Sequence, residues 1–361
     1  MLMYHSNVGD KPNKNVKYSL LVDGSIRDVT QEGRSIGFVC CSKCTRFKLI
    51  VVISLIIIGA VFVTYKLTIS FRSSPVIESS AVSFTQSVNA TEHFSDKIRY
   101  KHTKRHLPEC IIIGIRKSGT RALLTYLNLH PHIRTATEEI HFFDNDDNYS
   151  RGLEWYRKKM PYSFPEEITI EKTPAYFSTR IVPDRVYHMN SSIKLLLIVR
   201  EPYERTVSDY VQISMKKQAK NLPVYPFEQM VLKKNGEINM QYSPLVRSVY
   251  HMYMENWLRR FDLKQFHIIN GDNLIKDPYS EIRLIEDFLG LSHRIKKKNF
   301  YFNESRGFFC IRNETRDKCL AASKGREHPL IDSYVRDKLK QFFRPFNERF
   351  FELIQRRFDW N

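Results

Sequence analysis

The sequence is poor in acidic residues, in cysteine and in long apolar runs, and it contains no internal repeat. The missing repeat argues against a repeat architecture. Only one uncharged apolar run could cross a membrane, which excludes a protein with several spans. The 39 Asp and Glu are outnumbered by 57 Lys and Arg, giving a net charge of +18. Such a charge favours a polyanionic partner: nucleic acid, an acidic membrane surface or an acidic polysaccharide.

The apolar run covers residues 49–65 and reaches a full membrane-spanning length if it continues to residue 69. More Lys and Arg precede the run than follow it, so the N-terminus is predicted to be cytosolic. We therefore expect a cytosolic tail (1–48), a transmembrane signal anchor (49–69), a stem (70–107) and one lumenal domain (108–361). A cleaved signal peptide fits less well because 48 residues precede the run, and a buried soluble helix would have a polar face.

The six cysteines divide between the two sides of the predicted span. Cys310 and Cys319 lie in the predicted oxidising compartment, nine residues apart, and are expected to form one disulfide. Cys110 is expected to be a buried free thiol. The three cysteines before the span are either palmitoylated or unmodified. Five glycosylation sequons follow the span and support the lumenal placement, namely those at Asn89, Asn148, Asn190, Asn303 and Asn313.

A phosphate-binding loop is predicted between Gly114 and Gly119. Three successive Ile before Gly114 predict a buried parallel strand, and an Ala/Leu-rich helix begins at Thr120. Backbone N–H groups at such a helix start can face an anion. A nucleotide triphosphatase would place Lys and then Ser or Thr after the second glycine, for Mg²⁺. Here Thr120 and Arg121 follow, and the lysine lies inside the loop as Lys117, which predicts a nucleotide used without Mg²⁺.

Apolar runs alternate with helical patterns in the rest of the domain, which predicts an α/β fold with a mostly parallel central sheet flanked by helices. The further strands are predicted at 169–170, 194–199 and 266–269, and the helices at 120–130, 202–217, 243–261, 278–289 and 333–355. Ligands of such sheets bind beyond the carboxyl ends of the strands.

Cations follow three of the predicted strands. Lys117 follows the first, Lys172 follows 169–170 and Arg200 follows 194–199, so we expect all three in one crevice. Arg200 with Ser208, in the next helix, is a candidate second phosphate site. The alternative is a helix-capping ion pair, with Ser208 on the surface.

Glu139, His141 and Asp144 are spaced so that they could surround one substrate hydroxyl. A general base must reach the hydroxyl proton, and a nearby cation keeps that base ionised. A metal site and a solvated loop are the alternatives, although no other His or Cys cluster lies close in sequence.

Several long stretches together resemble one family. They include IIIGIRKSGTRALL, EIHFFDND, GLEWYRKKMP, ITIEKTPAYF, MNSSIKLLLIVREP, SDYVQ, GDNLIKDP, NFYFN, GFFC and SKGREHP. On these motifs, residues 108–361 resemble the heparan sulfate glucosamine 3-O-sulfotransferases, which are Golgi sulfotransferases, and are more similar to the one-type and five-type isoforms than to the three-type.

The resemblance implies a P-loop-like sulfotransferase fold, similar to nucleotide kinases, in a single-pass type II Golgi membrane protein. The donor would be 3′-phosphoadenosine 5′-phosphosulfate, used without a metal, and the partner would be heparan sulfate rather than nucleic acid. Sulfate would pass to the glucosamine 3-hydroxyl by in-line displacement. Glu139 would act as the general base, His141 and Asp144 would orient base and sugar, and Lys117 and Lys172 would stabilise the developing charge.

The same resemblance implies two sets of binding residues. The donor would be held by Lys117, Ser118, Gly119, Thr120, Arg121, Arg200, Ser208, Phe309, Lys324, Gly325, Arg326, Glu327 and His328. The acidic oligosaccharide would be held by Arg116, Lys172, Gln212, Lys324 and Arg326. The alternatives are a sulfotransferase of other regiochemistry and a non-catalytic membrane protein that binds heparan sulfate.

Overall fold

The computed structural model describes residues 101–312, 317–321, 325–326 and 328–360. The predicted tail, the predicted span and most of the predicted stem lie outside these residues. Among the residues that are described, no helix is both long and apolar enough to cross a membrane.

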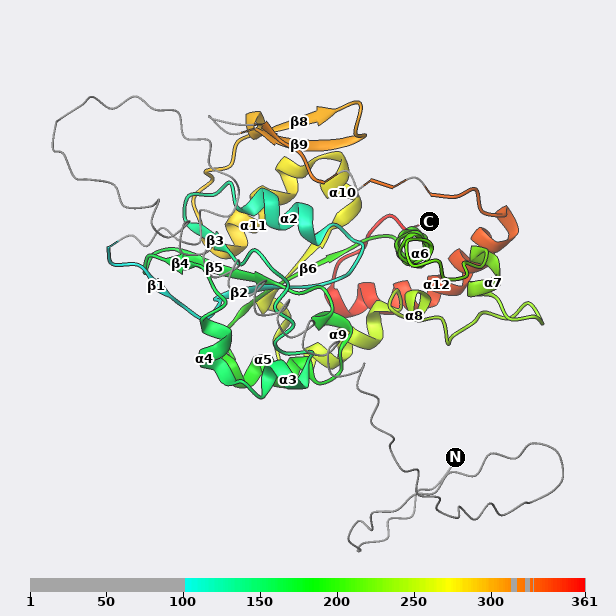
Figure 1. The fold of residues 1–361 in the computed structure, drawn as a ribbon, viewed down its shortest axis with the longest axis horizontal. Helices are drawn as coiled ribbons and strands as arrows, with labels where there is room; N and C mark the ends of the chain where they lie inside the picture. Colours follow the sequence, from blue (N-terminus) through cyan, green and yellow to red (C-terminus); the bar gives the residue numbers. More distant parts are fainter. Residues whose placement is uncertain (1–100, 313–316, 322–324, 327, 361) are drawn as a thin grey trace, which may run out of the picture. The chain divides into compact units, whose positions relative to one another are not determined.

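A five-stranded sheet forms the centre of the described domain, and every neighbouring pair of its strands is parallel (Figure 1). This confirms the predicted α/β class with a parallel sheet, and the four predicted strands are all present. The fifth strand was missed because it has three residues and only one of them is buried. In spatial order the strands are β3 (Ile133–Thr135), β5 (Ile168–Lys172), β2 (Cys110–Gly114), β6 (Lys194–Val199) and β7 (Phe266–Asn270).

Helices cover both faces of this sheet (Figure 1). Successive side chains of a strand point to opposite faces, so the run of three Ile in β2 supplies both cores. Ile112 packs in the cluster that contains α2 and α11, whereas Ile111 and Ile113 pack in the cluster that contains α5 and α9. One face carries α2 (Thr120–Leu127), α10 (Gly271–Lys276) and α11 (Pro278–Leu289); the other carries α5 (Val182–Met189), α9 (Tyr250–Leu258) and the C-terminal part of α12 (Ser333–Ile354).

A third apolar cluster lies beside the sheet, where α6 (Pro202–Gln218), α7 (Phe227–Val231) and α8 (Ser243–Val246) pack against the first half of α12. The smaller elements are two antiparallel sheets and several short helices. They are β1 (Lys104–Arg105) with β4 (Tyr162–Ser163), β8 (Phe300–Asn303) with β9 (Phe308–Arg312) and β10 (Asp317–Lys318), α3 (Asp146–Tyr149), α4 (Gly152–Arg157), η1 (Tyr176–Ser178), η2 (Leu263–Gln265) and η3 (Lys297–Asn299).

Three of the five predicted helices are confirmed to within one residue, those at α6, α11 and α12. The single helix predicted over 243–261 is wrong, because α8 and α9 are separated by a turn at 247–249. Tertiary contacts explain the break: the Ser248 hydroxyl accepts a hydrogen bond from Arg205 Nε (2.7 Å), and Arg247 pairs with Asp209 (2.8 Å). The helix predicted to reach residue 130 ends at Leu127.

Candidate active site

The predicted phosphate loop lies between the end of β2 and the start of α2. Gly119 precedes the helix with φ 107°, in the left-handed region that favours glycine. Ser118 is fully buried, and its hydroxyl has no hydrogen-bond partner within the described part of the chain. Gly271 of α10 backs the loop so closely that a Cβ there would lie 2.7 Å from the Ser118 carbonyl oxygen. The loop is therefore a close-packed cradle whose helix N–H groups suit an anion.

The three predicted cations Lys117, Lys172 and Arg200 lie at the ends of three neighbouring parallel strands, namely β2, β5 and β6. Their carboxyl ends share one edge of the sheet, as predicted. Arg200 is oriented there by an ion pair from its Nε to Asp272 Oδ1 (2.9 Å). Asp272 was not among the predicted site residues, although it follows the end of β7 and the same strand-end rule would have found it. The alternative, a helix-capping ion pair at the start of α6, is not what the structure shows. Glu201 caps α6 by accepting from backbone amides, and Arg200 pairs with Asp272 of α10 instead.

His328 joins this region from the C-terminal segment. Its Nδ1 lies 3.2 Å from Glu204 Oε2 on α6. The hydrogen bond from His328 outweighs partial burial and lowers the pKa of Glu204, with a further contribution from the charge of Arg200. Ser208 lies four residues beyond Glu204 and therefore on the same side of the helix. Glu204 thus connects His328 to the first turn of α6, within reach of the charge of Arg200.

The remaining predicted donor contacts come from the small antiparallel sheet and the segment after it. The Phe309 carbonyl accepts a hydrogen bond from the Tyr126 hydroxyl (3.1 Å), which ties β9 to α2. Cys310 and Cys319 form a disulfide. Arg326 has a buried Nε without a hydrogen-bond partner among the described residues, and Gly325 has φ 64°. Lys324 and Glu327 lie outside the described residues.

Four side chains form a connected cluster at the end of β5. Lys172 Nζ donates a hydrogen bond to Glu139 Oε1, and Glu139 Oε2 lies 3.9 Å from His141 Nε2. His141 Nδ1 lies 2.8 Å from Asp144 Oδ2. Lys172 is buried, whereas the side chains of Glu139 and His141 are 38% and 44% exposed and so remain accessible to a substrate.

The charge state of Glu139 follows from this cluster. Burial acts to raise its pKa, but the hydrogen bond and charge of Lys172, with the charges of His141 and Arg121, outweigh it and hold the pKa below the usual range. Arg121 is fixed nearby by a hydrogen bond to the Thr137 carbonyl (3.1 Å). Glu139 is therefore an ionised carboxylate at neutral pH, able to accept a proton. Within the described ranges, no group of three or more His, Cys, Asp or Glu is placed to hold a metal.

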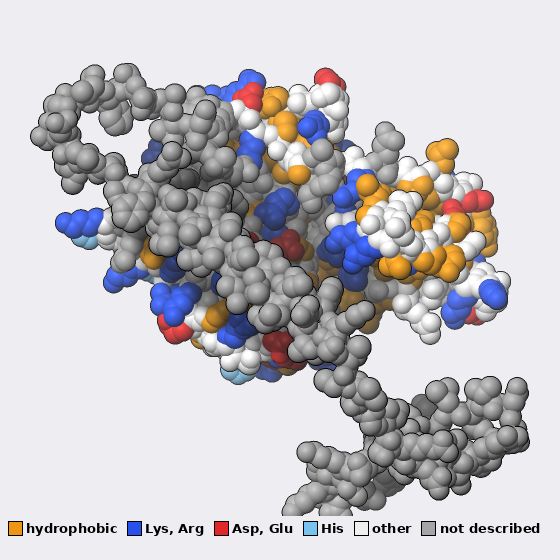
Figure 2. All heavy atoms as spheres, viewed as in Figure 1, with side chains coloured by type: hydrophobic (Ala, Val, Ile, Leu, Met, Phe, Trp, Pro, Cys, Tyr) orange, Lys and Arg blue, Asp and Glu red, His pale blue; other side chains and the backbone are white. Residues whose placement is uncertain are grey.

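Two predicted acceptor contacts lie together on the side of α6. Arg116 Nη2 donates to Gln212 Oε1 (3.2 Å), and Arg116 Nε pairs with Asp209 Oδ1 (2.9 Å). Asp209 is fully buried and also pairs with Arg205 and Arg247. Figure 2 shows Lys and Arg side chains around a hollow bordered by the β8–β9 region and by α6. Asp209 was not among the predicted site residues, although it lies between Ser208 and Gln212 in the motif SDYVQ.

Among the described sequon asparagines, Asn148 has a structural task. Its Nδ2 donates to the carbonyls of Ile140 (3.2 Å) and His141 (3.0 Å). A glycan on this nitrogen would displace at least one of these hydrogen bonds, and glycosylation at this sequon stays a prediction. Asn190 and Asn303 accept local hydrogen bonds through Oδ1, and Asn89 and Asn313 lie outside the described residues.

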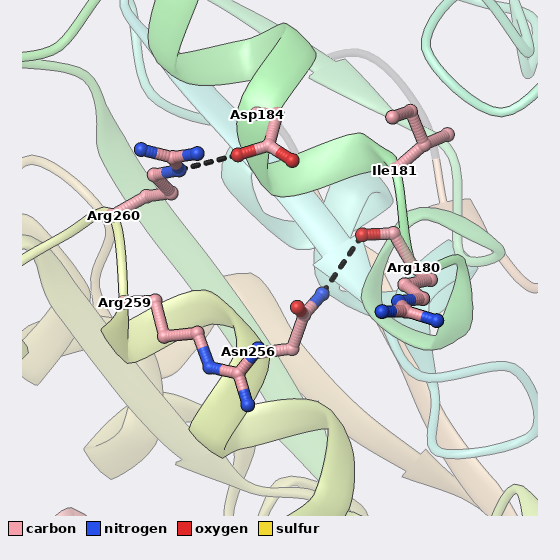
Figure 3. A pocket seen from close by; sticks show the side chains of 6 residues that line it. All are labelled: Arg180, Ile181, Asp184, Asn256, Arg259 and Arg260. Carbon is pink, nitrogen blue, oxygen red and sulfur yellow. Dashed lines mark hydrogen bonds and ion pairs between the residues drawn. The ribbon is translucent and has the colours of Figure 1, made fainter. Parts of the chain in front are cut away.

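A pocket of about 580 Å³ lies apart from these clusters, between the start of α5 and the end of α9 (Figure 3). Arg260 pairs there with Asp184, and Asn256 donates to the Arg180 carbonyl (2.9 Å). None of the sequence-predicted site residues lines this pocket. Its lining residues are Arg180, Ile181, Asp184, Asn256, Arg259 and Arg260.

Comparison with known proteins places this geometry in a family. The sulfotransferase domain family matches residues 107–359. Human heparan sulfate glucosamine 3-O-sulfotransferase 5 is 52% identical over 267 residues, covering 73% of this chain and 77% of the relative. The mouse protein of the same name is 54% identical, covering 71% of this chain and 75% of the relative. Human 3-O-sulfotransferase 6 is 40% identical, covering 71% and 75%.

A solved structure supports the fold. The sulfotransferase from Alicyclobacillus acidocaldarius superposes with a TM-score of 0.53 at 20% identity, covering 70% of this chain and 98% of that one. The predicted resemblance is confirmed, with the five-type relatives showing the higher identity among those named. The chain belongs to the sulfotransferase family and, within it, to the heparan sulfate glucosamine 3-O-sulfotransferases.

Proposed function

We propose that this protein transfers the sulfuryl group of 3′-phosphoadenosine 5′-phosphosulfate to the 3-hydroxyl of glucosamine residues in heparan sulfate. The observation that carries the proposal is the Lys172–Glu139–His141–Asp144 cluster, placed at the sheet edge where the phosphate loop and Arg200 also lie. The relatives at 52% and 54% identity carry the name of this activity.

The donor side of the site suits an anionic nucleotide. The Ser118 hydroxyl and Arg326 Nε are buried polar groups without protein partners in the described part of the chain, and such groups suit an anionic ligand. In our proposal the loop from Lys117 to Arg121 holds the 5′-phosphosulfate, while Arg200 and Ser208 hold the 3′-phosphate. Phe309 and the segment from Lys324 to His328 complete the binding of the nucleotide.

The acceptor side supplies the proton chemistry. Glu139 takes the proton from the attacking hydroxyl, and His141, held by Asp144, orients the sugar. Lys172 keeps Glu139 ionised and, with Lys117, faces the negative charge that develops during transfer. A positioned general base contributes roughly 10²- to 10⁴-fold. Arg116 and Gln212, with Lys172, Lys324 and Arg326, bind the acidic oligosaccharide, and a polyanionic substrate suits a chain of net charge +18.

The test is the position of sulfate on the product. The purified domain is incubated with heparan sulfate and ³⁵S-labelled donor, and the labelled disaccharides are separated. Label on the glucosamine 3-hydroxyl supports the proposal, label only at the 6- or N-position assigns another regiochemistry, and polysaccharide binding without turnover assigns a non-catalytic binder. Full activity in EDTA is the expected behaviour of a metal-independent transfer.

We further propose that the protein is a single-pass type II protein of the Golgi membrane. The support is the uncharged run at 49–65 with its basic N-terminal flank. Protease treatment of sealed Golgi vesicles tests this: the proposal predicts a protected catalytic domain and a clipped N-terminal tail, whereas digestion of the catalytic domain would contradict it.

A further inference from the structure

The backbone between the proposed base and its histidine is held by a buried side-chain network that the mechanism above does not use. Glu171, which precedes Lys172 in β5, is fully buried. The backbone amide of Ile140 hydrogen-bonds to its carboxylate. Its Oε1 also accepts from the Thr173 hydroxyl (2.5 Å), and Thr173 Oγ1 in turn accepts from the His141 amide (3.3 Å).

Two further side chains extend this hold. The Tyr176 hydroxyl accepts from the Phe142 amide (3.0 Å), so three successive amides of the loop are bound from the β5–η1 side. From α3, Asn148 Nδ2 donates to the carbonyls of Ile140 and His141. The loop backbone is therefore clamped through both its donors and its acceptors.

The clamp holds an unusual conformation. His141 has φ 51°, in the left-handed region that a residue with a side chain rarely adopts. Such a backbone persists only where surrounding contacts over-determine it. Here the hydrogen bonds flank the peptide links between Glu139 and Phe142, so they fix the direction in which both Glu139 and His141 leave the chain.

We propose that Glu171, acting through Thr173 and together with Asn148, is a positioning residue that sets where the base Glu139 meets the acceptor hydroxyl. The inference rests on the proposed function. Burial raises the pKa of Glu171 to about 7, and an apolar side chain would fill this core position without the cost of burying an ionisable group. The carboxylate instead binds one loop amide directly and a second through Thr173.

Thr173 and Tyr156 provide a matched pair of variants. Each hydroxyl hydrogen-bonds to Glu171, at 2.5 Å from Thr173 and 3.2 Å from Tyr156, but only Thr173 continues to the His141 amide. Thr173→Val and Tyr156→Phe each remove a buried hydrogen bond to the same carboxyl group, and both side chains also interact with Tyr176, so the two variants are matched in these respects. Only the first change also removes the acceptor of the His141 amide.

The experiment measures kcat, the acceptor KM and nucleotide-product affinity for the full chain and its variants. For Thr173→Val we expect kcat to fall roughly 10- to 100-fold, since a displacement of about 1 Å in a catalytic group can cost 10²-fold, with KM and nucleotide affinity nearly unchanged. Thr173→Ser restores kcat, and Tyr156→Phe retains it. Asn148→Asp, which removes the donors from the opposite side, lowers kcat in the same way.

Equal loss of kcat in Thr173→Val and Tyr156→Phe, or full activity in Thr173→Val and Asn148→Asp, would overturn the positioning role. If the wild-type chain sulfates glucosamine at the 3-hydroxyl and Thr173→Val is as active, only this inference fails. If the wild-type chain binds heparan sulfate but transfers no sulfate, the proposed function itself is refuted.

Discussion

Lys172 Nζ donates a hydrogen bond to Glu139 Oε1, which joins a buried lysine at the end of β5 to a carboxylate from a loop 33 residues earlier. The lysine is shielded from water while the carboxylate remains accessible. The pair therefore presents an ionised base to the substrate without exposing the cation that keeps it ionised. The proposed role of Lys172 in holding the base ionised follows from this contact.

Glu139→Gln removes the proposed base while keeping its shape. We expect kcat to fall about 10²- to 10⁴-fold, because the amide cannot accept the hydroxyl proton. Binding of heparin and of adenosine 3′,5′-bisphosphate should be unchanged, because neither proposed binding set includes Glu139. Calorimetric titration beside the activity assay checks both; retained turnover would refute the base assignment.

Lys172→Met should change how activity depends on pH. Without the lysine, the main influence that lowers the pKa of Glu139 is lost while burial, which raises it, remains. A higher pKa leaves the base protonated up to a higher pH, so the acidic limb of the kcat–pH profile should shift to higher pH. Lys338→Met serves as the control, because the Lys338 ammonium on α12 donates to the Tyr334 hydroxyl (3.1 Å) and is not among the charges that set the pKa of Glu139. An acidic limb at the same pH in both variants would show that Lys172 does not set the charge of the base.

Asp209 should be a major contributor to stability. Asp209→Asn leaves Arg116, Arg205 and Arg247 without their shared carboxylate, and breaking a buried ion pair typically costs about 3–5 kcal/mol. Burial acts to raise the pKa of Asp209, but the three arginines lower it overall. Its contribution is therefore present above the ordinary carboxyl pKa and is lost as the pH falls below it.

Urea unfolding of wild type and Asp209→Asn, followed between neutral and acidic pH, measures this contribution. The difference between the two proteins should shrink at the acidic end. Glu237→Gln, which removes an exposed partner of Lys233, should leave the midpoint unchanged. A midpoint for Asp209→Asn equal to that of Glu237→Gln would contradict the assignment.

Removing the disulfide should loosen the donor side of the site. Cys310 and Cys319 are nine residues apart, and the entropy of closing so short a loop corresponds to about 3 kcal/mol. The bridge also anchors β9, whose Phe309 carbonyl is bound by Tyr126 of α2. We expect Cys310→Ser with Cys319→Ser to weaken nucleotide binding more than heparin binding. Cys110→Ser, at a buried free thiol, controls for loss of core packing; equal nucleotide affinity in both would contradict the link.

The sequence was informative where chemistry and local pattern coincide. The Ile run before Gly114 and the KLLLIV run before Arg200 both predict strands, and the residues that follow them meet at one sheet edge because adjacent parallel strands end together. What could not be predicted depends on contacts between distant segments. The Glu204–His328 pair joins residues 124 positions apart, and the break between α8 and α9 follows from contacts of Arg247 and Ser248 with residues of α6.

The buried hydrogen bonds that hold the loop from Ile140 to Phe142 could not be predicted from the sequence either. Glu171 stands beside Lys172 in the sequence, yet alternation along β5 sends the two side chains to opposite sides of the strand. Only the fold reveals that Glu171 lies under the loop from Ile140 to Phe142. The sequon at Asn148 stays a prediction, and nothing in its sequence indicated that the same amide binds the loop carbonyls.

The most direct test of 3-O-sulfation with Glu139 as the base is the position of ³⁵S-sulfate on heparan sulfate after reaction with the wild-type chain and with Glu139→Gln. We predict label on the glucosamine 3-hydroxyl with the wild-type chain and almost none with the variant. Label at another position, or equal label with both proteins, would contradict it.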